Sequence, residues 1–317
     1  MRNNMPVSQR EHPFPKGATL MSTTDPQSRI TYANAAFTAL SGFAQEELLG
    51  ETHNLVRHPD VPAEAFADLW RTVQAGDSWT AVVKNRRKDG DHYWVRANVT
   101  PIQREGQLVG YMSVRTEPTP AEVQAAEGLF ALMRRAQAEG RRLPWQLYKG
   151  LLVRRGALAW LSAGKTWSLA ARLWLASALA VLPGVAALTW APLSGVQQLW
   201  GLAALLAGFG LAGAFLHAQV TRPTRAVLQQ ARQVAAGEAP RDAHLERADE
   251  LGMLMRAVSQ SGLNLLALLD DVAGQSSALA ESSRVIASGS MDLSARTESQ
   301  ASSLEQTAAS LEELSAT

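Results

Sequence analysis

Arg57, His58 and Asp60 stand close together in the segment NLVRHPDVP, which covers residues 54–62. Two prolines restrict its backbone, and the segment follows neither the helical nor the strand period. A guanidinium and an imidazole beside a carboxylate can make charge-assisted hydrogen bonds to a phosphate, a ring carbonyl or a sugar hydroxyl. The segment is therefore either a solvated loop or the wall of a pocket that grips an anionic, aromatic ligand.

The residues from about Met21 to Pro118 are short strands mixed with short helices, and these elements must position that segment. RITYANAAFTALSGF begins as a strand and turns into a helix, and QEELLG is a second short helical stretch. WTAVVKNRR, HYWVRANVTPI and LVGYMSVRT are strand-like runs separated by the turn sequences KDGD and REGQ. The sequence predicts one α+β unit with an antiparallel sheet of five strands.

The composition excludes several kinds of site. The 317-residue chain is long enough for more than one structural unit. It has no cysteine, which excludes disulfides, thiolate metal sites, cysteine nucleophiles and flavin photochemistry through a cysteine adduct. Its six histidines show no metal-ligand spacing, and no glycine-rich dinucleotide-binding fingerprint is present. The basic run KNRRK, residues 84–88, leads into a tight turn without a basic companion face, so nucleic acid is not an expected partner.

A long charge-free interval runs from Leu173 to Thr221. It is long enough to cross a bilayer twice, at roughly 20 residues per crossing. We expect a transmembrane hairpin over 169–217, with helices at about 173–190 and 199–216. Arginines and lysines flank its outer ends and its turn is uncharged, which predicts that both ends face the cytoplasm. The alternative is a buried helical hairpin in a soluble protein.

The segments on either side of this hairpin also have distinct patterns. Residues 1–20 form a polar N-terminal cap without the apolar run of a signal peptide. Residues 119–168 are expected to be a helical linker followed by a basic, tryptophan-bearing segment that lies against the membrane surface. Residues 218–271 resemble a HAMP module, with one short helix through Val227 and a second that begins at DELG and continues through Met255. That resemblance implies a parallel four-helix bundle in a homodimer.

The last segment, 272–317, repeats every seven residues. Val272, Leu279, Ile286 and Leu293 share one position, and leucines at 304 and 311 supply its companion position. Seven-residue spacing of apolar side chains predicts a coiled coil.

The segment Met21–Thr116 resembles a PAS sensor domain. More narrowly, LMSTTD, NLVRHPDVP, KNRRKDGDHYWVRAN and REGQLVGYMSVRT resemble the amino-terminal domain of the bacterial aerotaxis receptors. Members of that family hold FAD non-covalently and read its redox state. The resemblance implies FAD-binding roles for six residues: Asn34, Arg57, His58, Asp60, Trp79 and Asn85.

The same resemblance implies the function of the chain. We expect a multi-pass protein of the bacterial inner membrane that signals redox state by conformational change and is not an enzyme. Respiratory-chain proteins are possible electron donors. A region beyond Thr317 would contact the chemotaxis histidine kinase and its coupling protein, so the sequence would be a fragment or a truncated gene product.

LSARTESQASSLEQTAASLEELSAT resembles the first adaptation helix of methyl-accepting chemotaxis proteins. The modified positions of that helix correspond to Ser299, Gln306 and Glu313. Serine cannot carry the methyl ester and Gln306 would first need deamidation, so Glu313 is the methylation candidate that needs no prior change.

Two other functions are compatible with the sequence. One is a PAS-containing chemotaxis transducer that senses a small ligand or a haem-bound gas, for which His58 or His92 would be the axial ligand. The other is a membrane flavoprotein oxidoreductase, which would need a second substrate pocket and a nicotinamide site. A visible spectrum distinguishes haem from flavin.

Overall fold

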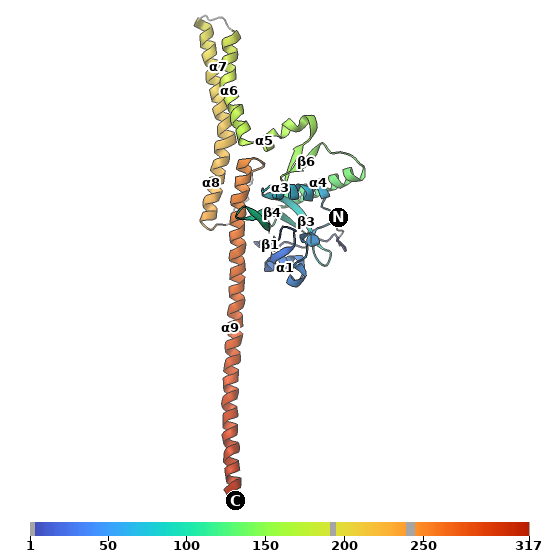
Figure 1. Ribbon diagram of the computed structural model, residues 1–317, viewed down its shortest axis with the longest axis vertical. Helices are drawn as coiled ribbons and strands as arrows, with labels where there is room; N and C mark the ends of the chain where they lie inside the picture. Colours follow the sequence, from blue (N-terminus) through green and yellow to red (C-terminus); the bar gives the residue numbers. More distant parts are fainter. Residues whose placement is uncertain (1–3, 191–194, 239–244, 317) are drawn as a thin grey trace. The chain divides into compact units, whose positions relative to one another are not determined.

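The computed structural model describes residues 4–190, 195–238 and 245–316 (Figure 1). It divides into two units, Met1–Ala267 and Leu268–Thr317.

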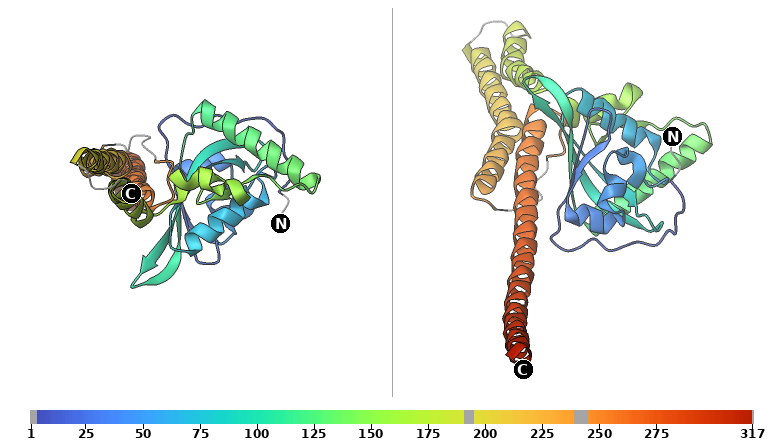
Figure 2. Two further views of the ribbon diagram at one scale, coloured as in Figure 1. Left: turned by 90° about the horizontal axis from the view of Figure 1, so that it is seen from above. Right: turned by 60° about the horizontal axis from the view of Figure 1, so that its bottom comes forward.

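The first unit contains an antiparallel five-stranded sheet with the strand order β2-β1-β5-β4-β3. Two strands come early in the chain and three come late, as the sequence predicts. The register pairs Trp79 with Val99 and Ser22 with Ser113. Beyond Val99, β4 pairs with β5 but no longer with β3, and from Ile102 onward β4 and β5 continue as a two-stranded ribbon (Figure 2). The strands are β1 (Leu20–Thr24), β2 (Ile30–Ala33), β3 (Trp79–Arg86), β4 (His92–Arg104) and β5 (Gln107–Thr116).

Alternation along β4 directs its side chains to two separate cores. Tyr93 and Val95 are fully buried in a cluster with Phe37 of α1. Trp94 points the other way and stacks on Phe130 of α4, with 6.2 Å between ring centroids. Both faces of the sheet are therefore covered. The helices of the first face are α1 (Ala35–Ser41), α2 (Gln45–Leu48), η1 (His53–Val56) and α3 (Ala63–Gln74), and the second face packs on α4 (Pro120–Ala138).

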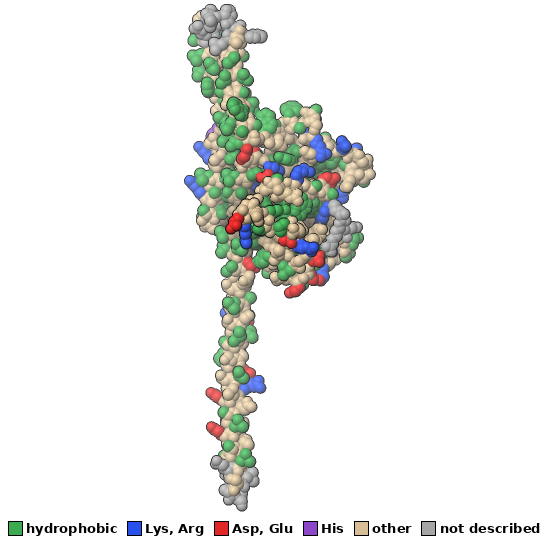
Figure 3. Space-filling view, viewed as in Figure 1, with side chains coloured by type: hydrophobic (Ala, Val, Ile, Leu, Met, Phe, Trp, Pro, Cys, Tyr) green, Lys and Arg blue, Asp and Glu red, His purple; other side chains and the backbone are tan. Residues whose placement is uncertain are grey.

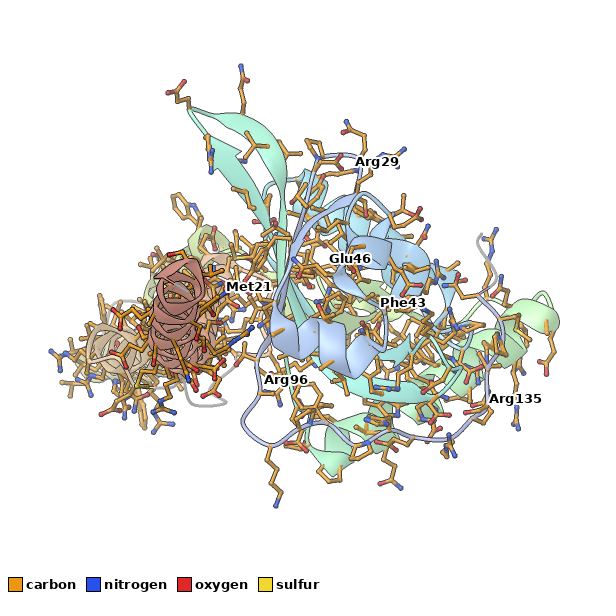
Figure 4. The ribbon with its side chains drawn as sticks, turned by 90° about the horizontal axis from the view of Figure 1, so that it is seen from below. Met21, Arg29, Phe43, Glu46, Arg96 and Arg135 are labelled. Atoms are coloured by element: carbon orange, nitrogen blue, oxygen red, sulfur yellow. The ribbon has the colours of Figure 1, made fainter. Side chains whose placement is uncertain are left out.

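A third, smaller cluster lies on the β1 and β5 part of the sheet. Met21 and Val114 are buried there with Ala267. Figure 4 shows Met21 and Phe43 on opposite sides of the sheet, in agreement with their different clusters. Arg256, also in the first unit, donates to the backbone oxygens of Ser78 (3.3 Å) and Lys149 (2.7 Å).

The linker differs from its expected structure in its second half. Its first half is helical, since α4 begins with a capping box between Thr119 and Glu122. In the second half, β6 (Trp145–Tyr148) and β7 (Leu151–Arg154) form an antiparallel hairpin that was not predicted from the sequence, and the contact of this segment with a membrane surface stays a prediction. The Lys-Gly turn between them, with positive φ at both residues, allows this close reversal. The short helices η2 (Gly156–Ser162) and α5 (Ala163–Thr166) follow.

Two apolar helices come next, α6 (Leu169–Trp190) and α7 (Gly195–Leu216). Stretches beginning at Leu169 and Leu199 have mean hydropathies of 1.7 and 1.9 and are long enough to cross a membrane. Small residues let the two helices approach closely, because a Cβ added at Gly208 would lie 2.7 Å from the carbonyl oxygen of Leu179. Hydrophobic side chains cover the visible face of this pair (Figure 3). Part of the expected turn, 191–194, lies outside the described residues.

The segment expected to be a HAMP module contains two helices. The π-helical turn η3 (His217–Thr221) joins α7 to α8 (Arg222–Ala235), and α9 (Glu250–Ala316) begins in the DELG sequence. Val227 of α8 and Met255 of α9 are buried. The connector is described only outside 239–244, and the four-helix bundle stays a prediction.

Buried charges join the base of α6 to the start of α9. Asp249, which has no exposed side-chain surface, lies 3.2 Å from Nε of Arg172 and also pairs with Arg247. An unpaired carboxylate at this depth would be strongly destabilising.

The second unit is the continuation of α9. Its helical state agrees with the sequence prediction, and Leu279, Ile286 and Leu293 are all exposed. Pairing of this seam stays a prediction. The side chains of Glu313 and Leu314 lie outside the described part of the chain.

Candidate ligand-binding site

A cavity of about 270 Å³ lies among the sheet, η1 and α3 in the first unit. Its walls combine large apolar side chains with a few polar ones, the composition typical of a small-molecule site. The ring of Trp70 meets that of Tyr111 edge-on, with 5.3 Å between centroids and an interplanar angle of 78°. The principal lining residues are Val56, Phe66, Leu69, Trp70, Trp79, Val83, Ala97, Val99 and Tyr111, with Thr24, His53, Arg57, Asn85, Ser113 and Arg115 among the polar ones.

Strand alternation explains how distant segments supply these side chains. Tyr111, Ser113 and Arg115 lie two residues apart on β5 and therefore share one face. Val83 and Asn85 do the same on β3. The sheet thus presents a row of alternate residues to the cavity.

Three of the six predicted flavin-binding residues line this cavity: Arg57, Trp79 and Asn85. The backbones of Arg57 and Asn85 form an antiparallel bridge, which brings the loop onto β3. The Arg57 guanidinium lies 3.8 Å from the centroid of the Phe66 ring, and its Nη2 donates to the Val61 carbonyl oxygen at 3.3 Å. Its Nε is buried without a hydrogen-bond partner in the described structure. One donor of this guanidinium is therefore available to a ligand.

Asn34 does not line the cavity. Its Oδ1 accepts hydrogen bonds from the backbone N–H groups of Met21 and Phe37, both at 3.0 Å, and its Nδ2 donates to the Thr19 carbonyl oxygen at 2.8 Å. It caps α1 and ties that helix to β1. Its contacts in the structure are thus those of a structural residue.

His58 and Asp60 also lie outside the cavity lining, in a separate polar cluster with Lys84 and His92. Nδ1 of the fully buried His58 accepts from the Asp60 backbone N–H at 3.1 Å, and the Asp60 carboxylate lies 2.8 Å from Nζ of Lys84. The rings of His58 and His92 meet edge-on at 5.6 Å. The two histidines considered as haem ligands therefore face each other and not the cavity.

Arg115 is a buried cation in the cavity wall that was not predicted from the sequence. Both of its terminal nitrogens lie 3.2 Å from Ser22 Oγ, and Nη2 contacts Nε2 of His53. Burial lowers the pKa of Arg115 to about 10, so it remains charged at neutral pH. Its place on alternate positions with Tyr111 and Ser113 was the signal that could have identified it.

The cavity fits part of a flavin. Its aromatic walls suit a flat ring, and its two guanidiniums suit ring carbonyls or phosphate. Buried hydroxyl oxygens of Thr24 and Ser113 have no hydrogen-bond partner in the described structure and could bond to ring-edge groups. The volume is just below the roughly 300–1,000 Å³ of ligand pockets, so it would enclose the ring and leave the rest of an FAD outside.

A larger hollow of about 770 Å³ lies on the other face of the sheet. Residues of β3, α4, the β6–β7 hairpin and the start of α9 line it, and Trp79 borders both hollows. Since neither Arg57 nor Asn85 reaches it, the smaller cavity is the better candidate for the ligand site.

The buried histidines predict acid-sensitive stability. Burial, followed by repulsion from Arg115, lowers the pKa of His53 to about 3; burial and Lys84 lower the pKa values of His58 and His92 to about 4. In the unfolded chain these groups titrate near 6.5, so between about pH 4 and 6.5 the unfolded state binds more protons. The histidine contribution to stability is complete above pH 6.5 and is lost as the pH falls through that window. Each contributes a slope of about 1.4 kcal/mol per pH unit.

Thermal unfolding midpoints at pH 7.0, 6.0, 5.0 and 4.5 measure this dependence. His58→Gln keeps an acceptor for the Asp60 N–H but removes one titrating ring, so its pH slope should be smaller than that of the parent. Midpoints that do not change over this range would show that the buried histidines are not neutral in the folded protein.

The comparisons agree with the resemblance predicted from the sequence. Residues 30–115 match the PAS fold family. The chain is 44% identical to the Escherichia coli aerotaxis receptor over 283 residues, which are 89% of this chain and 53% of that protein. It is 28% identical to a nitrogen fixation regulatory protein of Klebsiella pneumoniae over 103 residues, 32% of this chain and 21% of that protein. The chain thus spans about half or less of the length of these relatives. A solved PAS domain from Colwellia psychrerythraea has 24% identity and a TM-score of 0.30, with 32% of this chain and 86% of that chain covered.

Proposed function

We propose that this chain is the sensing and membrane part of an aerotaxis receptor and that it binds FAD in the cavity of its PAS domain. The observation that carries this proposal is an aromatic cavity lined by Arg57, Asn85 and Trp79, in a chain 44% identical to an aerotaxis receptor over 89% of its length. A bound flavin would supply one- or two-electron redox chemistry.

The residues of the cavity would bind the flavin and respond to a change in its charge and protonation. Arg57 and Arg115 contribute positive charge that favours a more negative ring over a neutral one. The Asn85 amide can either donate or accept a hydrogen bond, so it can answer a change in ring protonation. The apolar walls exclude water, which strengthens each of these interactions.

The three predicted residues outside the cavity would act indirectly. His58 and Asp60 fix the loop that carries Arg57, because Asp60 is held by Lys84 and by Arg134, which donates to its backbone oxygen. Asn34 fixes α1 against β1. Loss of any of the three would disturb the cavity without removing a direct ligand contact.

Transmission would pass to the HAMP segment within a homodimer. We infer that α6 and α7 cross the bacterial inner membrane with the PAS domain, HAMP and both termini on the cytoplasmic side. The cavity would exist in two conformations, and a shift in their relative populations would bias the HAMP bundle. No turnover of a substrate is required. The protein would accordingly be a transducer and not an enzyme.

The signal would pass from the HAMP segment along α9 to the chemotaxis proteins. Respiratory-chain proteins would supply electrons, and the chemotaxis histidine kinase and its coupling protein would bind a region beyond Thr317. Gln306 lies on an exposed part of α9, where a modifying enzyme could reach it, and Glu313 is the proposed methylation site. A methyl ester detected at Glu313 by mass spectrometry would support that assignment.

The visible spectrum of the membrane-extracted protein tests the cofactor. Paired near-ultraviolet and blue bands that bleach on reduction are expected, and the chromophore released by heat should be chromatographically identical to FAD. A colourless protein that takes up no added FAD, or one with an intense haem band, would refute the proposal.

A further inference from the structure

The turn of the β6–β7 hairpin is bound by a buried carboxylate of the PAS domain. Asp68 lies on α3 with only 2% of its surface exposed. Its Oδ1 accepts from the Lys149 backbone N–H at 3.0 Å, and its Oδ2 accepts from the Gly150 N–H at 2.7 Å. Burying a carboxylate is costly unless donors meet it, and two of the donors here come from a segment about 80 residues away in the sequence.

The conformation of the turn explains why it can reach this carboxylate. Lys149 and Gly150 have φ values of +50° and +79°, and consecutive positive φ angles are typical of a two-residue hairpin turn. Successive backbone N–H groups can then converge on one anion. A Cβ at Gly150 would overlap the carbonyl oxygen of Thr80, so glycine is required by close approach as well as by φ. The Lys149 ammonium adds an ion pair to Asp77 at 2.8 Å.

The same carboxylate also holds the cavity wall. The indole Nε1 of Trp79 donates to Asp68 Oδ2 at 2.9 Å, and this is the only donor that an indole ring has. Trp79 is 1% exposed and lines the candidate flavin cavity. Oδ2 is therefore shared between a side chain that faces the ligand site and a backbone group of the hairpin.

We propose that Asp68 is a positioning residue that couples the flavin cavity to the β6–β7 hairpin. Any change in the cavity that turns the Trp79 indole alters the carboxylate that holds Lys149 and Gly150, and undocking of the hairpin frees the indole in return. Coupling of this kind is reciprocal. The coupling half of this proposal rests on the proposed flavin function, whereas the docking half does not.

The rate of tryptic cleavage after Lys149 measures docking of the hairpin, because the Lys149–Gly150 peptide bond lies inside the docked turn. The cut after Lys149 is compared with the cut after Arg142, an exposed reference site in the same linker, by mass spectrometry of the full chain in detergent. Asp68→Asn places an NH₂ group, itself a donor, among the N–H groups of Trp79, Lys149 and Gly150. Because donors do not pair with one another, the turn should undock, and cleavage after Lys149 should become about tenfold faster or more relative to cleavage after Arg142. Gly150→Ala, a substitution in the hairpin itself, should do the same because its Cβ would overlap the Thr80 carbonyl oxygen.

A matched control separates undocking from general strain. Gly156 has a φ of +69° but no atom within 4 Å of an added Cβ, so Gly156→Ala carries similar backbone strain without a clash. It should leave the ratio of the two cuts unchanged. Unaltered protection of Lys149 in Asp68→Asn or in Gly150→Ala would overturn the docking of the hairpin.

Reduction of the bound flavin tests the coupling. Dithionite should change the ratio of cuts in the parent protein and leave it unchanged in Asp68→Asn. No change in the parent, or an equal change in both proteins, would overturn coupling through Asp68. A colourless protein would overturn the proposed function and the coupling together, while the ratio in the variants would still decide the docking.

Discussion

Arg57→Ala is expected to yield a protein that is isolated without its yellow colour. The Arg57 guanidinium lines the cavity, and its buried Nε has no hydrogen-bond partner in the described structure. A hydrogen bond from a charged donor contributes about 1.5–3 kcal/mol, which corresponds to roughly 10- to 150-fold in FAD affinity. The measurement is the ratio of flavin to protein absorbance, followed by titration of the stripped protein with FAD.

Two further variants make that result specific. Arg104→Ala removes an exposed arginine at the end of β4 and should keep full colour. Arg57→Lys keeps the charge but loses the planar fork of the guanidinium, so an intermediate affinity is expected. Full flavin content in Arg57→Ala would count strongly against this cavity as the FAD site.

The sheet could be predicted because its information is local. Alternation from Tyr93 to Ala97 and the turns KDGD and REGQ define the meander within short windows. The α1 helix could be placed because Asn34 is a strong N-cap and Gly42 ends it with a φ of +73°. Each of these signals depends on a few neighbouring residues.

The candidate site could be predicted only in part, because a cavity is assembled from segments that are distant in sequence. Arg57 could be identified because His58 and Asp60 lie beside it in one short loop. Arg115 could not, because no other charged residue lies beside it in its strand. The predicted trio in NLVRHPDVP also divides between two environments. Arg57 faces the cavity, whereas His58 and Asp60 face Lys84 and His92, because adjacent residues of an extended loop point in different directions.

The β6–β7 hairpin was missed for a related reason. Its strands are four residues each, and its arginines and tryptophan are equally typical of a membrane-surface segment. The hairpin turn is held by hydrogen bonds to Asp68 and lies close to the backbone of Thr80, and both residues belong to the PAS domain. In the hairpin sequence only Gly150 indicates this close approach. Tertiary contacts of this kind override local patterns.

The exposed seam of α9 gives the second large expected effect. Ile286 and Leu293 are 71% and 63% exposed in the single chain, which is unfavourable for large apolar side chains seven residues apart. Covering them in a dimer would bury four such side chains at about 1.5–3 kcal/mol each. The double variant Ile286→Lys/Leu293→Lys should therefore abolish pairing of this segment. The control variant Ser288→Lys/Ala295→Lys adds the same charge at the same seven-residue spacing, but on the outer surface of the predicted coil. This control should still form the dimer.

A single cysteine measures this pairing, because the chain has no other. Leu279→Cys in the parent background is expected to give a disulfide-linked dimer in high yield, and in the Ile286→Lys/Leu293→Lys background little or none. Residue 279 of one chain meets residue 279 of another across the seam only when the helices are parallel and in register, since antiparallel helices would place different positions opposite each other. The cross-link therefore reports the orientation that a parallel HAMP bundle upstream requires. Undiminished cross-linking in the double-lysine background would show that the seam does not hold the dimer.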